Sequence, residues 1–163
     1  MFLQEVVMAF RTGSSDYPTR ILFGFTAGFL ATLTFHQLSL LVLWAVGLAP
    51  FAPYSMAAAK PSGIPHVISL ALWGGVWGIL FALIHHRFPA HSGYWITAFL
   101  FGAVFTSLVG LLVVFPLKGQ PVGGGWHASL LLTEFIINGV WGIGLGFFLE
   151  ILSCPFSRRH VTA

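Results

Sequence analysis

Four stretches of this chain are long and apolar enough to cross a lipid bilayer, and they constrain its fold more than any other feature. They cover residues 21–47, 65–85, 94–115 and 128–153. A helix needs about 20 apolar residues to cross about 30 Å of hydrocarbon. Charged residues make up only 7% of the 163-residue chain, whereas soluble globular proteins have about a quarter. The sequence therefore predicts an all-α integral membrane protein with four spans.

A short repeat indicates how the four spans are related. The pentapeptide Gly-Val-Trp-Gly-Ile occurs at residues 75–79 and again at 139–143, each time in the second stretch of a pair. The first stretches of the two pairs share Leu-Phe-Gly at residues 22–24 and 100–102. Two helical hairpins repeated in the same orientation imply a pseudo-twofold axis along the membrane normal. We therefore predict a four-helix bundle built from two parallel-repeated hairpins.

The distribution of Lys and Arg predicts the orientation of the bundle, because these residues favour cytoplasmic segments. On one side lie five of them, Arg11, Arg20, Arg87, Arg158 and Arg159. On the other side lie two, Lys60 and Lys118. We expect both termini in the cytoplasm. The excess positive charge is then a signal for topology and lipid headgroups, and it does not imply a nucleic-acid partner.

Residues 1–20 precede the first span and have apolar residues at helical spacing, from Phe2 to Phe10. This pattern predicts a cytoplasmic amphipathic helix lying on the membrane surface, docked on lipid or on another subunit. The apolar stretch that follows is too long and begins too late for a signal peptide, so we interpret it as a retained span. Residues 21–163 are expected to form one transmembrane domain.

Each span has small residues four positions apart. Helices in a membrane associate by close packing, and small residues let their backbones approach. The alternative is a site where a cofactor or substrate presses on the backbone. We assign helix packing to Gly24, Gly28, Gly74, Gly78, Gly102, Gly110, Gly142 and Gly146.

One acidic residue, Glu134, lies inside a span, where an ionisable side chain costs about 2.5–3.5 kcal/mol. On a helical wheel, His127, Glu134 and Asn138 fall within about 40° of one another. In the first span, His36 continues the row of small residues four positions apart, and Gln37 is adjacent to it. The predicted polar intramembrane site consists of His36, Gln37, His127, Glu134 and Asn138.

Several uses of this site remain open. It could be a structural hydrogen-bonded cluster, or a proton or ion pathway in which Glu134 and His36 titrate. A metal would need His36, His127 and Glu134 to converge, and a haem would need two facing histidines drawn from these and His66. No close ligand spacing supports a metal, and His66 and His127 lie at helix ends whereas His36 lies deeper, which does not suit a haem. We therefore expect no cofactor. No catalytic motif is present, so we expect no enzyme activity.

Two further groups of residues are placed by depth. At the inner boundary, headgroup anchoring, or contact with lipid or a partner, is expected of His85, His86, Arg87 and His91. Deeper in the spans, core or subunit contacts are expected of Trp73, Trp77 and Trp141.

The third span ends in the sequence Phe-Pro-Leu-Lys-Gly at residues 115–119, and a Pro/Gly-rich loop follows. Glu134 comes early in the last span, with Trp141 a little further on. In these features residues 94–149 resemble the YagU-like inner-membrane proteins of proteobacteria, although the loop is shorter and Asn138 stands where a His is expected. The resemblance implies a bacterial inner membrane and about four spans, and it implies no activity.

The sequence thus predicts a small, non-enzymatic, multi-pass protein of the bacterial inner membrane. We expect an accessory or interaction subunit of a larger complex, whose partners are the lipid bilayer and other membrane subunits or a second copy. The alternative is a small transporter or proton or ion pathway built around Glu134 and His36.

Overall fold

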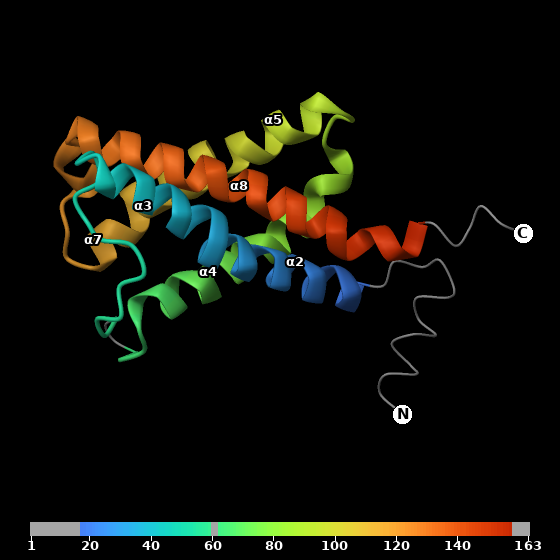
Figure 1. The fold of residues 1–163 in the computed structure, drawn as a ribbon, viewed down its shortest axis with the longest axis horizontal. Coiled ribbons are helices and arrows are strands. Elements are labelled where there is room, and N and C mark those ends of the chain that lie inside the picture. Colours follow the sequence, from blue (N-terminus) through green and yellow to red (C-terminus); the bar gives the residue numbers. More distant parts are fainter. Residues whose placement is uncertain (1–16, 60–61, 158–163) are drawn as a thin grey trace, which may run out of the picture.

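The computed structural model describes residues 17–59 and 62–157, and this part of the chain is helical without β-strands (Figure 1). It contains four helices long and apolar enough to cross a membrane, Tyr17–Ala45, His66–Arg87, Ser92–Leu117 and Ala128–Ser153. The prediction of an all-α chain with four such helices is confirmed. Residues 17–20 form the first turn of the first helix, whereas residues 1–16 of the predicted amphipathic segment lie outside the described residues.

Three of the spans change helix type along their length. The first consists of α2 (Tyr17–Ala31), the π-helical η2 (Thr32–His36) and α3 (Gln37–Ala45). The second consists of α4 (His66–Ile84) and the 3-10 turn η3 (His85–Arg87). The third consists of α5 (Ser92–Leu100), π-helical η4 (Phe101–Thr106), α6 (Ser107–Val109), π-helical η5 (Gly110–Val114) and α7 (Phe115–Leu117). The 3-10 turn η6 (Val122–Trp126) then leads to the fourth span, which is the single helix α8 (Ala128–Ser157).

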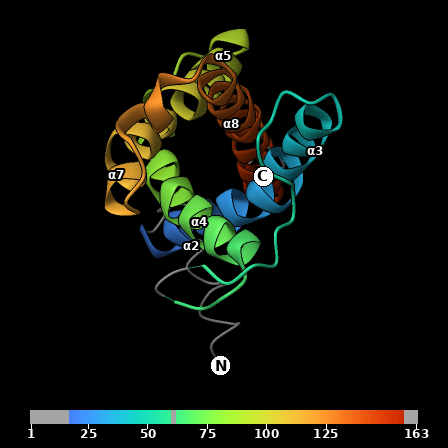
Figure 2. The ribbon, with the colours of Figure 1, turned by 90° about the vertical axis from the view of Figure 1, so that its left-hand side faces the viewer.

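The long helix α8 is the centre of the arrangement. It packs against α2 and η2 on one side and against α5 and η4 on the other, while α2 also packs along α4 (Figures 1 and 2). The main core consists of alanine, aromatic and leucine side chains, namely Ala27, Ala31, Phe81, Ala82, Ala98, Phe101, Trp141, Leu145 and Leu149. Apolar residues all along these helices are buried where they meet, and the remaining apolar faces point outward.

The first two spans meet backbone to backbone through four glycines. A methyl group built on Gly28 would overlap the carbonyl of Gly74, and one built on Gly78 would overlap the carbonyl of Gly24. The hydroxyl of Thr32 donates to the Gly28 carbonyl at 2.9 Å, within its own helix. Backbones can approach this closely only where no side chain stands between them. Such close packing drives helix association in a membrane, because lipid tails are as apolar as the side chains themselves.

The third and fourth spans make a similar contact. A methyl group on Gly102 would overlap the carbonyl of Asn138, and one on Gly142 would overlap the carbonyl of Ala98. Gly146 packs instead against the ring of Tyr94, whose hydroxyl donates to the Gly146 carbonyl at 3.4 Å.

Gly110 is not at such a contact, although we grouped it with the packing glycines. No atom lies within 4 Å of the position its Cβ would occupy, apart from its own neighbours along the chain. Gly102 lies within the π-helical η4, whose residues 103–106 come before Gly110, the first residue of the π-helical η5. A π-turn contains more residues than an α-turn, so the residues after it leave the row that a regular α-helix predicts.

The two hairpins touch each other unequally. The first span covers α8 along its length, and the indole N–H of Trp141 donates to the Gly28 carbonyl at 3.2 Å. On the opposite side, α4 reaches the third span through ring contacts, such as Phe81 with Phe101 at 5.2 Å between centroids. Within the described part of the chain, no comparably close backbone packing joins α4 to the third span.

Candidate functional site

Glu134 belongs to a hydrogen-bonded group that links the third and fourth spans. It lies one helical turn before Asn138, so the two side chains share a face of α8. The Asn138 amide Nδ2 donates to Glu134 Oε2 at 3.2 Å and to the hydroxyl of Ser107 at 3.0 Å. That hydroxyl donates in turn to the backbone carbonyl of Glu134 at 3.1 Å. Both Asn138 amide protons are therefore used within the group.

The second carboxylate oxygen of Glu134 is in a different situation. Among the described residues no group donates a hydrogen bond to Oε1, and the side chain is only partly buried. Lys118, exposed just after α7, lies close enough for its charge to act on the carboxylate. Glu134 thus has one oxygen fixed by Asn138 and one available, with a cation nearby toward the end of the bundle.

His36 and Gln37 belong to another group, which attaches the first loop to the first span. Gln37 is only 1% exposed, and its Oε1 accepts from the backbone N–H of Tyr54 at 2.6 Å. Its Nε2 then faces His36 Nδ1 at 3.2 Å. Because an amide nitrogen can only donate, His36 Nδ1 accepts, which places the imidazole proton on Nε2. The pair therefore requires a neutral His36.

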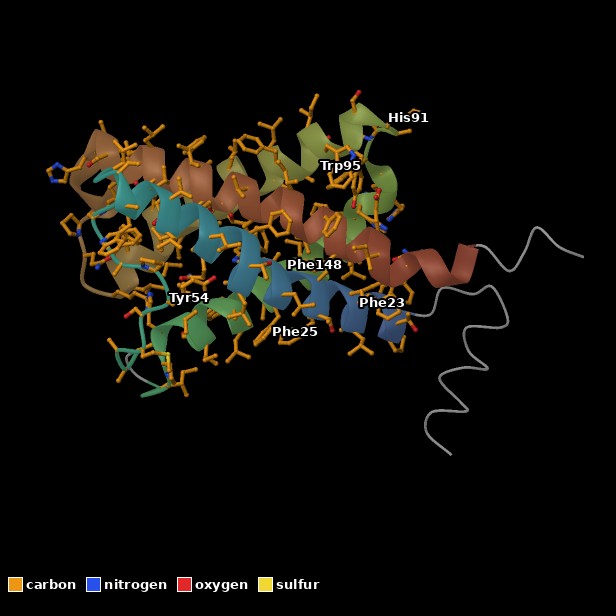
Figure 3. All side chains as sticks on the ribbon, viewed as in Figure 1. Phe23, Phe25, Tyr54, His91, Trp95 and Phe148 are labelled. Atoms are coloured by element: carbon orange, nitrogen blue, oxygen red, sulfur yellow. The ribbon has the colours of Figure 1, made fainter. Side chains whose placement is uncertain are left out.

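Tyr54, labelled in Figure 3, explains why the buried Gln37 is needed. Its backbone is left-handed, with φ at 49°, which costs a non-glycine residue free energy. The N–H bonds to Gln37, and the hydroxyl donates to the Leu33 carbonyl at 3.1 Å. These bonds hold the loop against the helix, so this group has an evident structural use.

His127 lies in neither group. Its side chain is exposed, and its backbone is extended, with φ −70° and ψ 122°. It follows η6, where Gly123, Gly124 and Gly125 are all left-handed. A helical wheel does not apply to a residue before the first helical turn, so the predicted alignment of His127 with Glu134 does not place it in the site.

The predicted site is therefore two separate groups. Glu134 is bonded with Asn138, and His36 with Gln37, and within the described residues no hydrogen bond joins the two groups.

The described residues also offer no ready set of metal ligands. No three His, Cys, Asp or Glu side chains within 17–59 and 62–157 lie close enough together to hold a metal ion. The three ligands considered from the sequence are dispersed, since His127 is exposed at the start of α8 while His36 and Glu134 belong to different groups.

Sequence reasoning missed two members of these groups, Ser107 and Tyr54. Ser107 is fully buried in α6. Its position as a serine within an apolar span is the signal that could have identified it. Tyr54 lies in a loop where nothing in the local sequence distinguishes it. Both act through contacts with residues far away in the chain.

Comparison with protein-family models, with curated proteins and with solved structures found no match to this chain.

Proposed function

We propose that this chain is a small, non-enzymatic, multi-pass protein of a bacterial inner membrane, and that it acts as an accessory or interaction subunit of a larger membrane complex. The observation that carries the proposal is Trp73, which is 64% exposed on α4. Trp73 comes seven residues after His66, the start of α4. This is a depth of about 10 Å along the helix axis.

An exposed tryptophan is unusual at this depth. Tryptophans facing lipid gather near the headgroups, where water can satisfy the indole N–H. In hydrocarbon an unpaired N–H is costly. Trp141 avoids this cost, because it is 3% exposed and donates to a carbonyl of the first span. A helix of a partner packed on α4 would do the same for Trp73.

The repeat supports this interpretation. The pentapeptide repeat relates the second span to the fourth by an offset of 64 residues. The helix contacts within the two hairpins then match if the first span is related to the third by an offset of 74 residues. Phe25 packs on Gly75 as Phe99 packs on Gly139. We infer a duplicated hairpin with this register, which is one helical turn away from the offset of 78 that the Leu-Phe-Gly repeat suggested.

In this register Trp73 corresponds to Ile137 of α8. Ile137 is 2% exposed and packs with Leu40 and Leu43 of the first span. Position 137 is thus covered by a helix of the other hairpin. Position 73 has no such cover among the described residues, and Leu72 and Val76 beside it are also exposed. We infer that a helix of another subunit covers α4 here.

The orientation we propose follows the charges. Arg20 and Arg87 lie at the end where the first span begins and the second ends, and Lys118 lies at the opposite end. Arg11, Arg158 and Arg159 lie outside the described residues, and in the sequence they fall on the same side as Arg20 and Arg87. Counted together, these five arginines favour cytoplasmic termini by the positive-inside rule. Trp73 then lies nearer the periplasmic face than the cytoplasmic face.

Cysteine crosslinking in native membranes tests the proposed subunit contact. In a Cys154→Ser background, we expect Trp73→Cys to give a discrete adduct with another membrane protein after treatment with a short bismaleimide. Trp44→Cys is the matched control, because Trp44 is also exposed but lies in the last turn of α3. Equal labelling by a lipid-soluble maleimide would show that both cysteines are accessible.

The mass of the adduct discriminates between partners. An adduct with a different membrane protein, absent with Trp44→Cys, agrees with an accessory subunit. An adduct of twice the mass of the chain shows a homo-oligomer and contradicts a role in a mixed complex. Accessible cysteines that form no adduct at position 73 contradict the proposed contact.

The second candidate, a proton or ion pathway, rests on the available Oε1 of Glu134. The arrangement favours it less, because His36 is held by Gln37 and no described hydrogen bond continues from Glu134 to it. Among the described residues, no acidic side chain besides Glu134 and Glu150 lies in the four spans, and Glu150 is exposed near the far end of α8.

Glu134→Gln is expected to be nearly silent. The amide oxygen of Gln can accept from Asn138 as the carboxylate does, so we expect the free energy of unfolding to change by less than about 1.5 kcal/mol. In reconstituted vesicles carrying a pH-sensitive dye, the wild-type protein should conduct protons no faster than empty vesicles. Proton flux that depends on the protein and disappears in a folded Glu134→Gln variant would establish the pathway instead.

A further inference from the structure

The close contact of α2 with α4 brings basic residues of two spans together at one end of the bundle. A methyl group on Gly24 would meet Ala82, so these two positions face each other across antiparallel helices. Arg20 lies one turn before Gly24, and η3 (His85–Arg87) begins just after Ala82. Arg20 therefore lies beside η3, and the charges of Arg20 and His86 both act on His85.

His85 has a fixed ring and an unsatisfied nitrogen. Its ring stacks on Phe81, with centroids 6.5 Å apart and an interplanar angle of 8°. Its Nδ1 is buried and lacks a hydrogen-bond partner, the one such side-chain atom in the described part of the chain. Buried polar atoms nearly always have a partner. Because this atom is covered, a ligand oxygen could reach it only after a small rotation of the ring, whereas the rest of the half-buried His85 side chain is accessible from this end.

The surface next to these basic residues is apolar. Phe88 packs edge-on against Phe81 at 5.2 Å, and Phe23 and Ile84 are only partly buried against the core. Figure 3 shows Phe23 near the end of the bundle where α2 begins. The second span ends at Arg87, so the change from apolar to basic surface occurs where hydrocarbon gives way to headgroups. A phospholipid likewise has an anionic group next to its acyl chains.

We propose that Arg20, His85, His86 and Arg87 bind the phosphate of an anionic phospholipid, whose acyl chains lie along the apolar surface beside η3. His86 and Arg87 are exposed and available to the headgroup. The nearest acidic side chain on α8 at this end is Glu150, and its charge acts on Tyr94. Basic groups between spans on the cytoplasmic side are a recurrent means of holding anionic lipids. The inference does not depend on the proposed subunit contact, which lies on another part of α4.

Native mass spectrometry of the purified full chain in mild detergent tests the proposal. We expect phosphatidylglycerol to bind more tightly than phosphatidylcholine. An arginine near the membrane surface contributes about five-fold in affinity, so Arg20→Gln with Arg87→Gln should weaken phosphatidylglycerol binding roughly 30-fold. The matched control is Lys118→Gln, which removes a positive charge at the opposite end and should leave the affinity unchanged.

Further variants and a competitor distinguish lipid binding from misfolding and from binding of soluble anions. The charge-preserving pair Arg20→Lys and Arg87→Lys should bind phosphatidylglycerol nearly as well as the wild type. Arg87→Gln alone changes an exposed residue, so it should fold and still weaken binding about five-fold. Equal binding of the two lipids, or an equal loss with Lys118→Gln, would overturn the proposal. Competition by inorganic phosphate as effective as by lipid would show a site for soluble anions and would also overturn it.

Discussion

A single added methyl group at Gly78 or Gly142 is expected to destabilise this protein strongly. Each would overlap a backbone carbonyl of the facing helix, at Gly24 and at Ala98 respectively. A backbone cannot rotate away as a side chain can, so the helices must separate. Overpacking of this kind costs about 1–3 kcal/mol. Thermal unfolding of Gly78→Ala and Gly142→Ala in mild detergent, followed by circular dichroism, measures the effect.

Gly110→Ala is the matched control, because no neighbouring atom lies within 4 Å of the new methyl group. Since alanine favours a helix over glycine by about 1 kcal/mol, we expect this variant to be unchanged or slightly more stable. Larger side chains at the contacts, in Gly78→Leu and Gly142→Leu, should prevent the native bundle from forming. If all three alanine variants unfolded at the same temperature, the glycines would not mark the helix contacts.

Phe81→Ala is expected to have the largest effect of any core substitution. Phe81 is fully buried, and its ring contacts Phe88, Tyr94 and Phe101, with centroids 5.2 to 6.3 Å apart. Removing a buried aromatic ring costs about 3–5 kcal/mol, because a cavity remains. The same unfolding measurement applies, with Leu72→Ala as the control on the exposed face of α4. An effect of Phe81→Ala no larger than that of the control would contradict this packing.

Phe81 also bears on the relation between the hairpins. It is one of the few residues through which α4 reaches the third span, since the close packing between hairpins is on the side of α8. We therefore expect Phe81→Ala to loosen the second span from the third while leaving the contact of α2 with α4 in place. Amide hydrogen exchange should therefore rise in the third span, while the amides of α2 at the contact with α4 stay protected.

The sequence alone predicted the features that depend on local pattern. Span lengths follow from hydropathy, because any apolar segment of sufficient length must satisfy its backbone as a helix in lipid. The four helices accordingly begin and end within four residues of the predicted stretches. The pairing of Glu134 with Asn138 is local as well, since residues four apart share a helix face.

Other features were decided by the tertiary structure. Ser107 joins Glu134 only because the third span packs on α8, and Tyr54 joins Gln37 only because the loop folds back on the first span. His127 and Gly110 left their predicted positions because extended backbone and π-turns break the regular α-helical period. Hydropathy gives the helices, but it does not give their crossing or rotation. These depend on the fit of side chains from distant segments, and that fit left Trp73 uncovered while it buried Ile137.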